Sequence, residues 1–331
     1  MRWLVFAATL AIAARPPVAF CEPTVELTQT AGASTDDVAA AATQVAVFGD
    51  VLAGMRFNVE AAWGARSSDL GDAFGTAYPY DNRPHVMEAY VERPFGPDAG
   101  LLSVRMGRYR TPFGISAGSE HAYIGYLRPP LIRYDGYYAL SNTFLEHGID
   151  IVVGTPALSF EVSAGIPADV GSARRRSGLD WVLRTQWFRG PLIVGGSYIR
   201  TRPYQSPLFA HGRSQFGGVD VRWMRNGIAL RGEWLGGRPF AGTRTDGGYL
   251  DLILHRPGMG PVTALARVER LVYDAEPPFA FTAARYTAGA RVRLRNNLAI
   301  TIGLVRQVSN GPDESRGSAL DLGITYAYRH Q

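Results

Sequence analysis

Apolar and polar residues alternate with a period of two through most of the chain after residue 54. One clear example has Leu158, Phe160 and Val162 on one side and Ser159 and Glu161 on the other. Successive side chains of a strand point to opposite faces, so each such segment has one apolar and one polar face. The pattern predicts an all-β protein.

The linkers between these segments alternate in length. Short linkers, such as 189–190 and 225–227, carry Gly, Pro or Asn, as tight hairpins require. Longer polar connections, such as 113–146 and 202–213, lie between them. A soluble sandwich has no reason to sort its connections this way, whereas an outer-membrane barrel has short periplasmic turns and long extracellular loops. We therefore predict a single antiparallel transmembrane β-barrel of about 14 strands (roughly 12 to 16), with both termini periplasmic.

The sequence leaves the start of the barrel open. Segment 45–53 either extends the first strand or, with 25–30, forms two further strands, which would give about 16. Residues 22–44 include a run of mostly small residues at 39–43 and are expected to form a flexible periplasmic N-terminal segment. The transmembrane barrel is then expected over 45–331.

Residues 1–21 predict a cleaved signal peptide. Arg2 supplies the positive start, and 4–14 is an apolar run too short to span a bilayer as a helix. Cleavage after Ala13 or after Cys21 would fit, and a short buried N-terminal helix is the alternative. No later stretch has about 18 or more apolar residues, so no transmembrane helix is expected.

The end of the chain also fits a bacterial outer-membrane protein. The last strand alternates up to His330, which resembles the C-terminal signal read by the barrel-assembly machinery, although Gln331 follows it. Export, this machinery and an outer-membrane location, in contact with lipid and lipopolysaccharide, are therefore expected.

Composition excludes several classes of site. The single cysteine rules out a disulfide framework. The six histidines are not spaced as metal ligands, and no phosphate-binding glycine loop is present. The chain has no lysine, and its 34 basic residues are arginines that follow the strand pattern and not a nucleic-acid stripe. No cofactor, metal or nucleic-acid partner is expected.

The run from Gly107 to Ile115 resembles a motif of the phosphate-selective (porin O/P-like) family of outer-membrane β-barrels. In that family a strand ending in Gly-basic-x-basic-Thr-Pro-Phe-Gly leads into a long loop. The motif positions here are Gly107, Arg108, Arg110, Pro112, Phe113 and Gly114, and the likeness covers 83–115. It implies a channel, assembled as a homotrimer, with arginines along the path. The family's phosphate specialists also use a lysine cluster, which this chain lacks.

Alternation places many charged residues on the polar face, and these are the candidates for lining the pore. The candidates are Arg105, Glu161, Arg184, Asp220, Arg222, Arg231, Glu233, Arg267, Glu269, Arg291, Arg293 and Arg295. The three arginines of 291–295 form a basic stripe that would favour anions; the alternative is that wall charges satisfy one another in cross-strand pairs. Arg108 and Arg110 are out of phase with Arg105, so they face the lumen only if the strand bulges and otherwise meet lipopolysaccharide phosphates.

Connection 113–146 is the longest. It either folds inward as a constriction, with Arg128, Arg133 and Tyr134 as candidates, or packs outside against a neighbouring subunit. We expect a porin-like channel for passive diffusion of small hydrophilic solutes or anions.

An enzyme is not expected. Ser309 resembles the serine of outer-membrane phospholipases, but Gln307 stands where their histidine lies and cannot act as a general base. The 114–118 segment matches a nucleophile elbow, yet no helix pattern follows it. A barrel hydrolase and a non-conducting structural or adhesive barrel remain the alternative functions.

Overall fold

The computed structural model describes most of the chain, with gaps that fall mainly in the long connections. The described residues are 23–52, 54–67, 82–96, 101–115, 126–133, 145–167, 179–201, 214–238, 244–255, 257–274, 280–310 and 315–330. The predicted signal peptide, 1–21, therefore lies outside the described residues.

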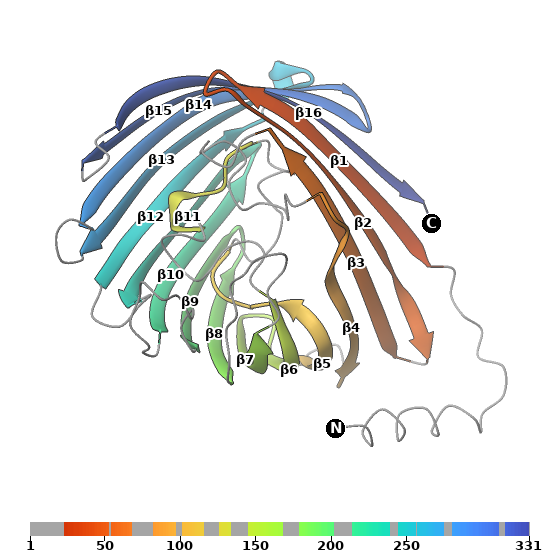
Figure 1. Ribbon diagram of the computed structural model, residues 1–331. Coiled ribbons are helices and arrows are strands. Elements are labelled where there is room, and N and C mark those ends of the chain that lie inside the picture. The colour runs from red at the N-terminus through yellow and green to blue at the C-terminus, as the bar shows by residue number, and fades with distance from the viewer. Residues whose placement is uncertain are drawn as a thin grey trace.

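Sixteen strands form one closed antiparallel barrel. Each strand pairs with its neighbours in sequence, and β1 pairs with β16 to close the ring (Figure 1). The strands are β1 Thr24–Ser34, β2 Val38–Leu52, β3 Met55–Arg66, β4 His85–Phe95, β5 Leu101–Arg110, β6 Leu145–Gly154, β7 Leu158–Pro167, β8 Asp180–Arg189, β9 Leu192–Thr201, β10 Ser214–Arg225, β11 Ile228–Arg238, β12 Arg244–Leu254, β13 Val262–Asp274, β14 Phe281–Arg295, β15 Leu298–Asn310 and β16 Ser315–His330. Two 3-10 turns, η1 Leu131–Arg133 and η2 Pro257–Met259, complete the elements of the described residues.

The alternation in the sequence separates the two faces of the wall. Val219, Phe160 and Leu304 are more than half exposed on the outer face, whereas Asp220 and Thr301 are buried on the inner face. Closure leaves no strand edge unpaired, so the backbone polar groups of the wall are satisfied within the barrel. No helix among the described residues is long and apolar enough to cross a membrane.

The strand count corrects the expectation of about fourteen. Residues 22–44, expected to be a flexible segment, contain β1 and the first half of β2, which pair over 24–34 with 38–48. Their small residues give weak alternation, but β1 gains a second partner in β16 (Figure 1). Pairing on both sides stabilises a segment that carries little hydrophobic signal of its own.

The short and long connections fall on opposite ends of the barrel, as the linker lengths predict. At the short-turn end, Asn226 and Gly227 have φ of 52° and 75°, the positive values that a type I′ hairpin turn needs. The four longest connections, 67–84, 111–144, 168–179 and 202–213, are all at the other end, although 35–37 and 311–314 at that end are short. Several of those long connections lie outside the described residues.

Candidate functional site

The connection that follows β5 enters the barrel. Residues 111–115 are buried, and the Gly114 amide donates to Ser197 Oγ of β9 at 3.1 Å. The Arg184 guanidinium of β8 donates to the Gly114 carbonyl. The motif segment therefore runs from β5 to the inner wall formed by β8 and β9.

A second part of the same connection, 126–133, also lies inside the barrel, close to β12 and β13 (Figure 1). Arg128 is its main anchor: Nε donates to Asp321 Oδ2 at 2.7 Å and Nη2 donates to Asp321 Oδ1 at 2.8 Å. Nη2 also reaches Ser34 Oγ and Asp36 Oδ2, each at 2.9 Å. One side chain thus joins β16, the end of β1 and the β1–β2 turn.

Two wall arginines hold the backbone of this segment. Arg267 donates to the Arg128 carbonyl at 3.0 Å while Asp251 binds its guanidinium. Arg285 donates to the Pro129 carbonyl and pairs with Glu269, at 2.6 Å from Nε to Oε2. Because both ion pairs are fully buried, each charge has the partner that burial requires.

Tyr126 adds an aromatic contact to this attachment. Its ring lies 4.0 Å from the Arg267 guanidinium, within cation–π range. Its hydroxyl donates to the Ala266 carbonyl at 2.6 Å. Burial raises the pKa of the Tyr126 hydroxyl, so the group keeps the proton that it donates.

Apolar contacts seal the remaining space between the loop and the β8–β14 wall. Phe113, Leu131 and Ile132 of the loop pack on inward-facing side chains of seven strands. Those wall residues are Val182, Ile199, Phe216, Leu235, Tyr249, Leu271 and Ala283, all buried. These apolar contacts lie beside the buried ion pairs, and together they settle the direction of the loop: its described parts lie inside.

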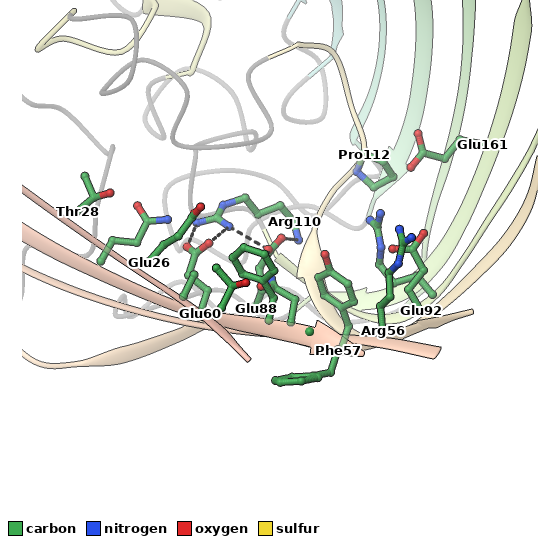
Figure 2. Close-up of a pocket in the computed structure, with 18 of the residues that line it drawn as sticks. Glu26, Thr28, Arg56, Phe57, Glu60, Glu88, Glu92, Arg110, Pro112 and Glu161 are labelled. Atoms are coloured by element: carbon green, nitrogen blue, oxygen red, sulfur yellow. Dashed lines mark hydrogen bonds and ion pairs between the residues drawn. The ribbon is translucent and has the colours of Figure 1, made fainter. Parts of the chain in front are cut away.

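A cavity of about 950 Å³ remains on the other side of the barrel. It extends from Thr24 and Asp50 at the short-turn end to Pro112 and Ile115 of the loop. Figure 2 shows part of its lining, with Glu60, Glu88 and Arg110 on one side and Glu161 across from them. Its charged lining residues are Glu26, Asp50, Arg56, Glu60, Glu88, Glu92, Arg105, Arg110, Glu161, Arg184 and Arg222, six carboxylates and five arginines.

Arg110 points into this cavity. Its Nη1 lies 3.1 Å from Glu60 Oε2 and 3.4 Å from Glu88 Oε2 (Figure 2). Alternation alone would place Arg110 on the outer face, but it is the last residue of β5 and its strand is distorted at Gly107, where φ is 135°. A Cβ at Gly107 would lie 2.4 Å from the Ala89 carbonyl oxygen, so only glycine fits there.

The structure sorts the candidate pore-lining residues into three groups. Arg105, Glu161, Arg184 and Arg222 line the cavity. Asp220, Arg231, Glu233, Arg267 and Glu269 are buried in the wall. Arg291, Arg293 and Arg295 line a separate recess at the short-turn end.

The remaining candidates are distributed unevenly. Arg108 pairs in register with His147, away from the cavity lining. Arg128 anchors the loop to the wall and does not line the cavity. Arg133 belongs to η1, and Tyr134 lies outside the described residues. Glu60 and Glu88 lie on the inner face where alternation places them, and the distortion of β5 brings Arg110 to them, which is the inward placement that the sequence left open.

The described residues give the catalytic alternatives no added support. No group of three or more His, Cys, Asp or Glu among them is arranged to hold a metal ion. Ser309 and Gln307 lie on β15, and Ser309 pairs with Ala283 and Ser315. The Ser309 segment thus continues an ordinary strand pairing.

No protein-family model matches the sequence, and comparison with curated proteins gives no match either. Solved structures do match in fold. The anion-selective porin from Comamonas acidovorans has a TM-score of 0.64 at 12% identity, over 93% of this chain and 100% of that one. OmpF of Salmonella typhi, in complex with daunomycin, has a TM-score of 0.62 at 11% identity, over 93% and 97%.

A third match is the trimer form of OmpT, an outer-membrane protein of Vibrio cholerae, with a TM-score of 0.57 at 9% identity, over 93% of this chain and 98% of that one. The chain therefore has the fold of bacterial outer-membrane porins. At identities this low the likeness shows the fold alone, and none of these three structures is named as a phosphate-selective porin.

Proposed function

We propose that the chain is an outer-membrane porin through which small hydrophilic solutes diffuse passively. The observation that carries this proposal is the charged cavity of about 950 Å³ inside a closed barrel with an apolar outer face. Such an apolar outer face suits contact with lipid, and a polar lumen suits water and hydrophilic solutes. The fold shared with outer-membrane porins supports the same assignment.

The proposed topology follows from the barrel's two ends. Residues 1–21 are removed as a signal peptide, and the assembly machinery inserts the barrel with its short turns and both termini in the periplasm. The longer connections then face outward, toward lipopolysaccharide. The outer faces of the strands contact lipid.

The loop that follows β5 acts as the constriction in this proposal. Its described parts cover the β8–β14 wall and leave the cavity on the other side. Arg105, Glu161, Arg184 and Arg222 line the path with the Glu60–Arg110–Glu88 cluster. Because six carboxylates face five arginines, we expect weak charge selectivity and a limit set by size.

A homotrimer is the proposed assembly. Every strand from β3 to β16 has a large exposed hydrophobic side chain, whereas none of the described side chains of β1 and β2 is in that class. The outer face there carries exposed Ala33, Ala39 and Ala41 instead. Small residues let two protein surfaces approach closely within a membrane, and one of the porin-fold structures is a trimer form.

Liposome swelling tests the channel. Proteoliposomes containing the refolded chain should swell in sugar solutions, fastest in a pentose, more slowly in a hexose and slowest in a trisaccharide. Heat-denatured protein is the control. Swelling no faster than with that control, from protein that circular dichroism shows to be folded, would contradict the proposal.

A further inference from the structure

A second cavity, of about 430 Å³, lies on the inner face at the short-turn end. It is formed by β12 to β16 and shares no lining residue with the larger cavity. The turn residues Pro261, Asn296 and Asn297 belong to its lining, so this recess opens at the rim of the barrel.

The recess is strongly basic. Arg291, Arg293 and Arg295 line it together with His255, and its described lining includes no carboxylate. A bulge between Arg293 and Arg295 interrupts the pairing of β14 with β15, so three arginines within five residues face one space.

The contrast with the rest of the inner wall is clear. Arg128, Arg231, Arg267 and Arg285 each bind a buried carboxylate. Arg293 and Arg295 form no ion pair with any residue in the described ranges. Their positive charge is therefore left for a ligand.

Other polar groups of the recess are fixed in place. His255 Nδ1 lies 3.1 Å from the Val262 carbonyl oxygen and 3.2 Å from Thr263 Oγ1. The His255 amide donates to the Gly227 carbonyl at 2.7 Å. These contacts hold the imidazole on the recess wall, whose lining also includes Asn296 and Asn297 of the β14–β15 turn.

The loop closes the inner end of the recess. On each of the strands β13, β14 and β15, the next residue on the same face lies two positions away, toward the loop. Gly289 is that neighbour of Arg291, Leu265 that of Thr263, and Thr301 that of Ala299. That next layer lies against the loop residues 126–128. The loop segment is held there by the buried arginine pairs, so the recess is blind.

We propose that this recess is a binding site for a small polyvalent oxyanion, such as a phosphate or a polycarboxylate, outside the diffusion path. Guanidinium groups bind such oxyanions through paired, charge-assisted hydrogen bonds. The inference uses the proposed function only to place the recess in the periplasm. The binding itself does not depend on conduction.

Calorimetric titration of the full, refolded barrel in detergent tests the binding, with inorganic pyrophosphate as the probe at low ionic strength. We expect wild-type protein to bind, and Arg293→Gln/Arg295→Gln to raise Kd at least about tenfold, as expected for lost charge-assisted hydrogen bonds. Arg222→Gln, which removes an arginine of the larger cavity, is the matched control and should leave Kd unchanged. No binding by wild type, or equal Kd values for wild type and the double variant, would overturn the site.

Reversal potentials test whether the recess is outside the path. At salt on the order of 1 M the Debye length is about 3 Å, so only charges along the path affect selectivity. Arg293→Gln/Arg295→Gln should keep the wild-type potential, and a shift toward cations would place the recess on the path and overturn that part of the proposal. If wild-type protein does not conduct, the proposed function fails while the calorimetric result still decides the binding site.

Discussion

Arg110 shows how one side chain sets the charge of the cavity. It lies between Glu60 and Glu88, and all three side chains are at most 15% exposed. Two carboxylates so close together need a cation between them, because like charges in a poorly solvated site repel. The arginine at the end of β5 therefore holds two acidic groups of the channel wall in place.

Replacing Arg110 should make the channel favour cations. An unneutralised charge at about 4 Å is worth about 1 kcal/mol in water-like surroundings, so we expect Arg110→Gln to raise the cation-to-anion permeability ratio about fivefold. Reversal potentials in a salt gradient measure this ratio. Arg110→Gln/Glu60→Gln restores the charge balance and should return the ratio toward wild type; an unchanged ratio in the single variant would place the cluster off the path.

The sequence predicts on which face of the barrel wall a charged residue lies, but it does not predict which other residues surround that side chain. Alternation places Arg222 and Arg267 on the same inner face, and the structure agrees. Arg222 lines the cavity, while Arg267 is buried beneath Arg128 and Tyr126 of a distant loop. Local periodicity contains no information on which loop covers which wall, because that contact joins residues about 140 positions apart.

At the scale of elements, the internal loop is held by a close fit as well as by charge. Leu127 is buried with Val38 and Ala40 of β2. Its side chain occupies the space beside Gly323 of β16, where an added Cβ would lie 2.5 Å from Leu127 Cδ2. The glycine therefore provides the space that lets the loop lie flat against the wall.

Gly323→Ala should loosen this attachment. Overpacking at a tight contact costs about 1 to 3 kcal/mol, so we expect larger and noisier single-channel steps as the loop moves into a less fixed position. Gly303→Ala is the matched control, since its nearest neighbours would lie 3.9 Å away and the step should stay as in wild type. Adding Leu127→Ala to Gly323→Ala should restore quiet steps; steps identical in all variants would show that this contact does not hold the loop.

The strands themselves were predictable wherever alternation was strong. From β3 onward the periodicity and the short turns locate the strands within a few residues, as at Asn226-Gly227. β1 and β2 were left open as two further strands and not counted among the expected fourteen, because alanines on both faces, such as Ala39 and Ala40, give no contrast between faces. Their three-residue connection also lies at the end where long loops were expected.

The whole barrel has an uneven outer surface. Large apolar side chains are exposed on β3 to β16, whereas the exposed apolar side chains of β1 and β2 in the described part are alanines. These two strands adjoin the seam between β1 and β16 (Figure 1). On the inner side, Arg128 joins the two strands of this seam through Asp321 and Ser34. The two strands that sequence periodicity left open thus form the surface proposed for contact between subunits.

A bulky residue on this face should disrupt the trimer. Ala41 is exposed on β2, and in Ala41→Trp the indole would hold neighbouring barrels apart, so we expect monomers in place of trimers. Analytical ultracentrifugation in detergent measures the mass. Val219→Trp changes a position that is 62% exposed on β10 and should leave the trimer intact; a monomeric wild type would contradict the proposed assembly.

The most direct test of the diffusion path is single-channel conductance in a planar bilayer, with cysteines as accessible labels. Asn58→Cys lies in the larger cavity and Thr263→Cys in the blind recess. Because the proposed cleavage after position 21 removes the chain's single cysteine, Cys21, each introduced cysteine is the one thiol of its mature chain. We predict stable steps that shrink when a charged thiol reagent modifies Asn58→Cys and stay constant for Thr263→Cys. Absence of steps from folded protein, or steps that modification at position 58 leaves unchanged, would contradict a path through the charged cavity.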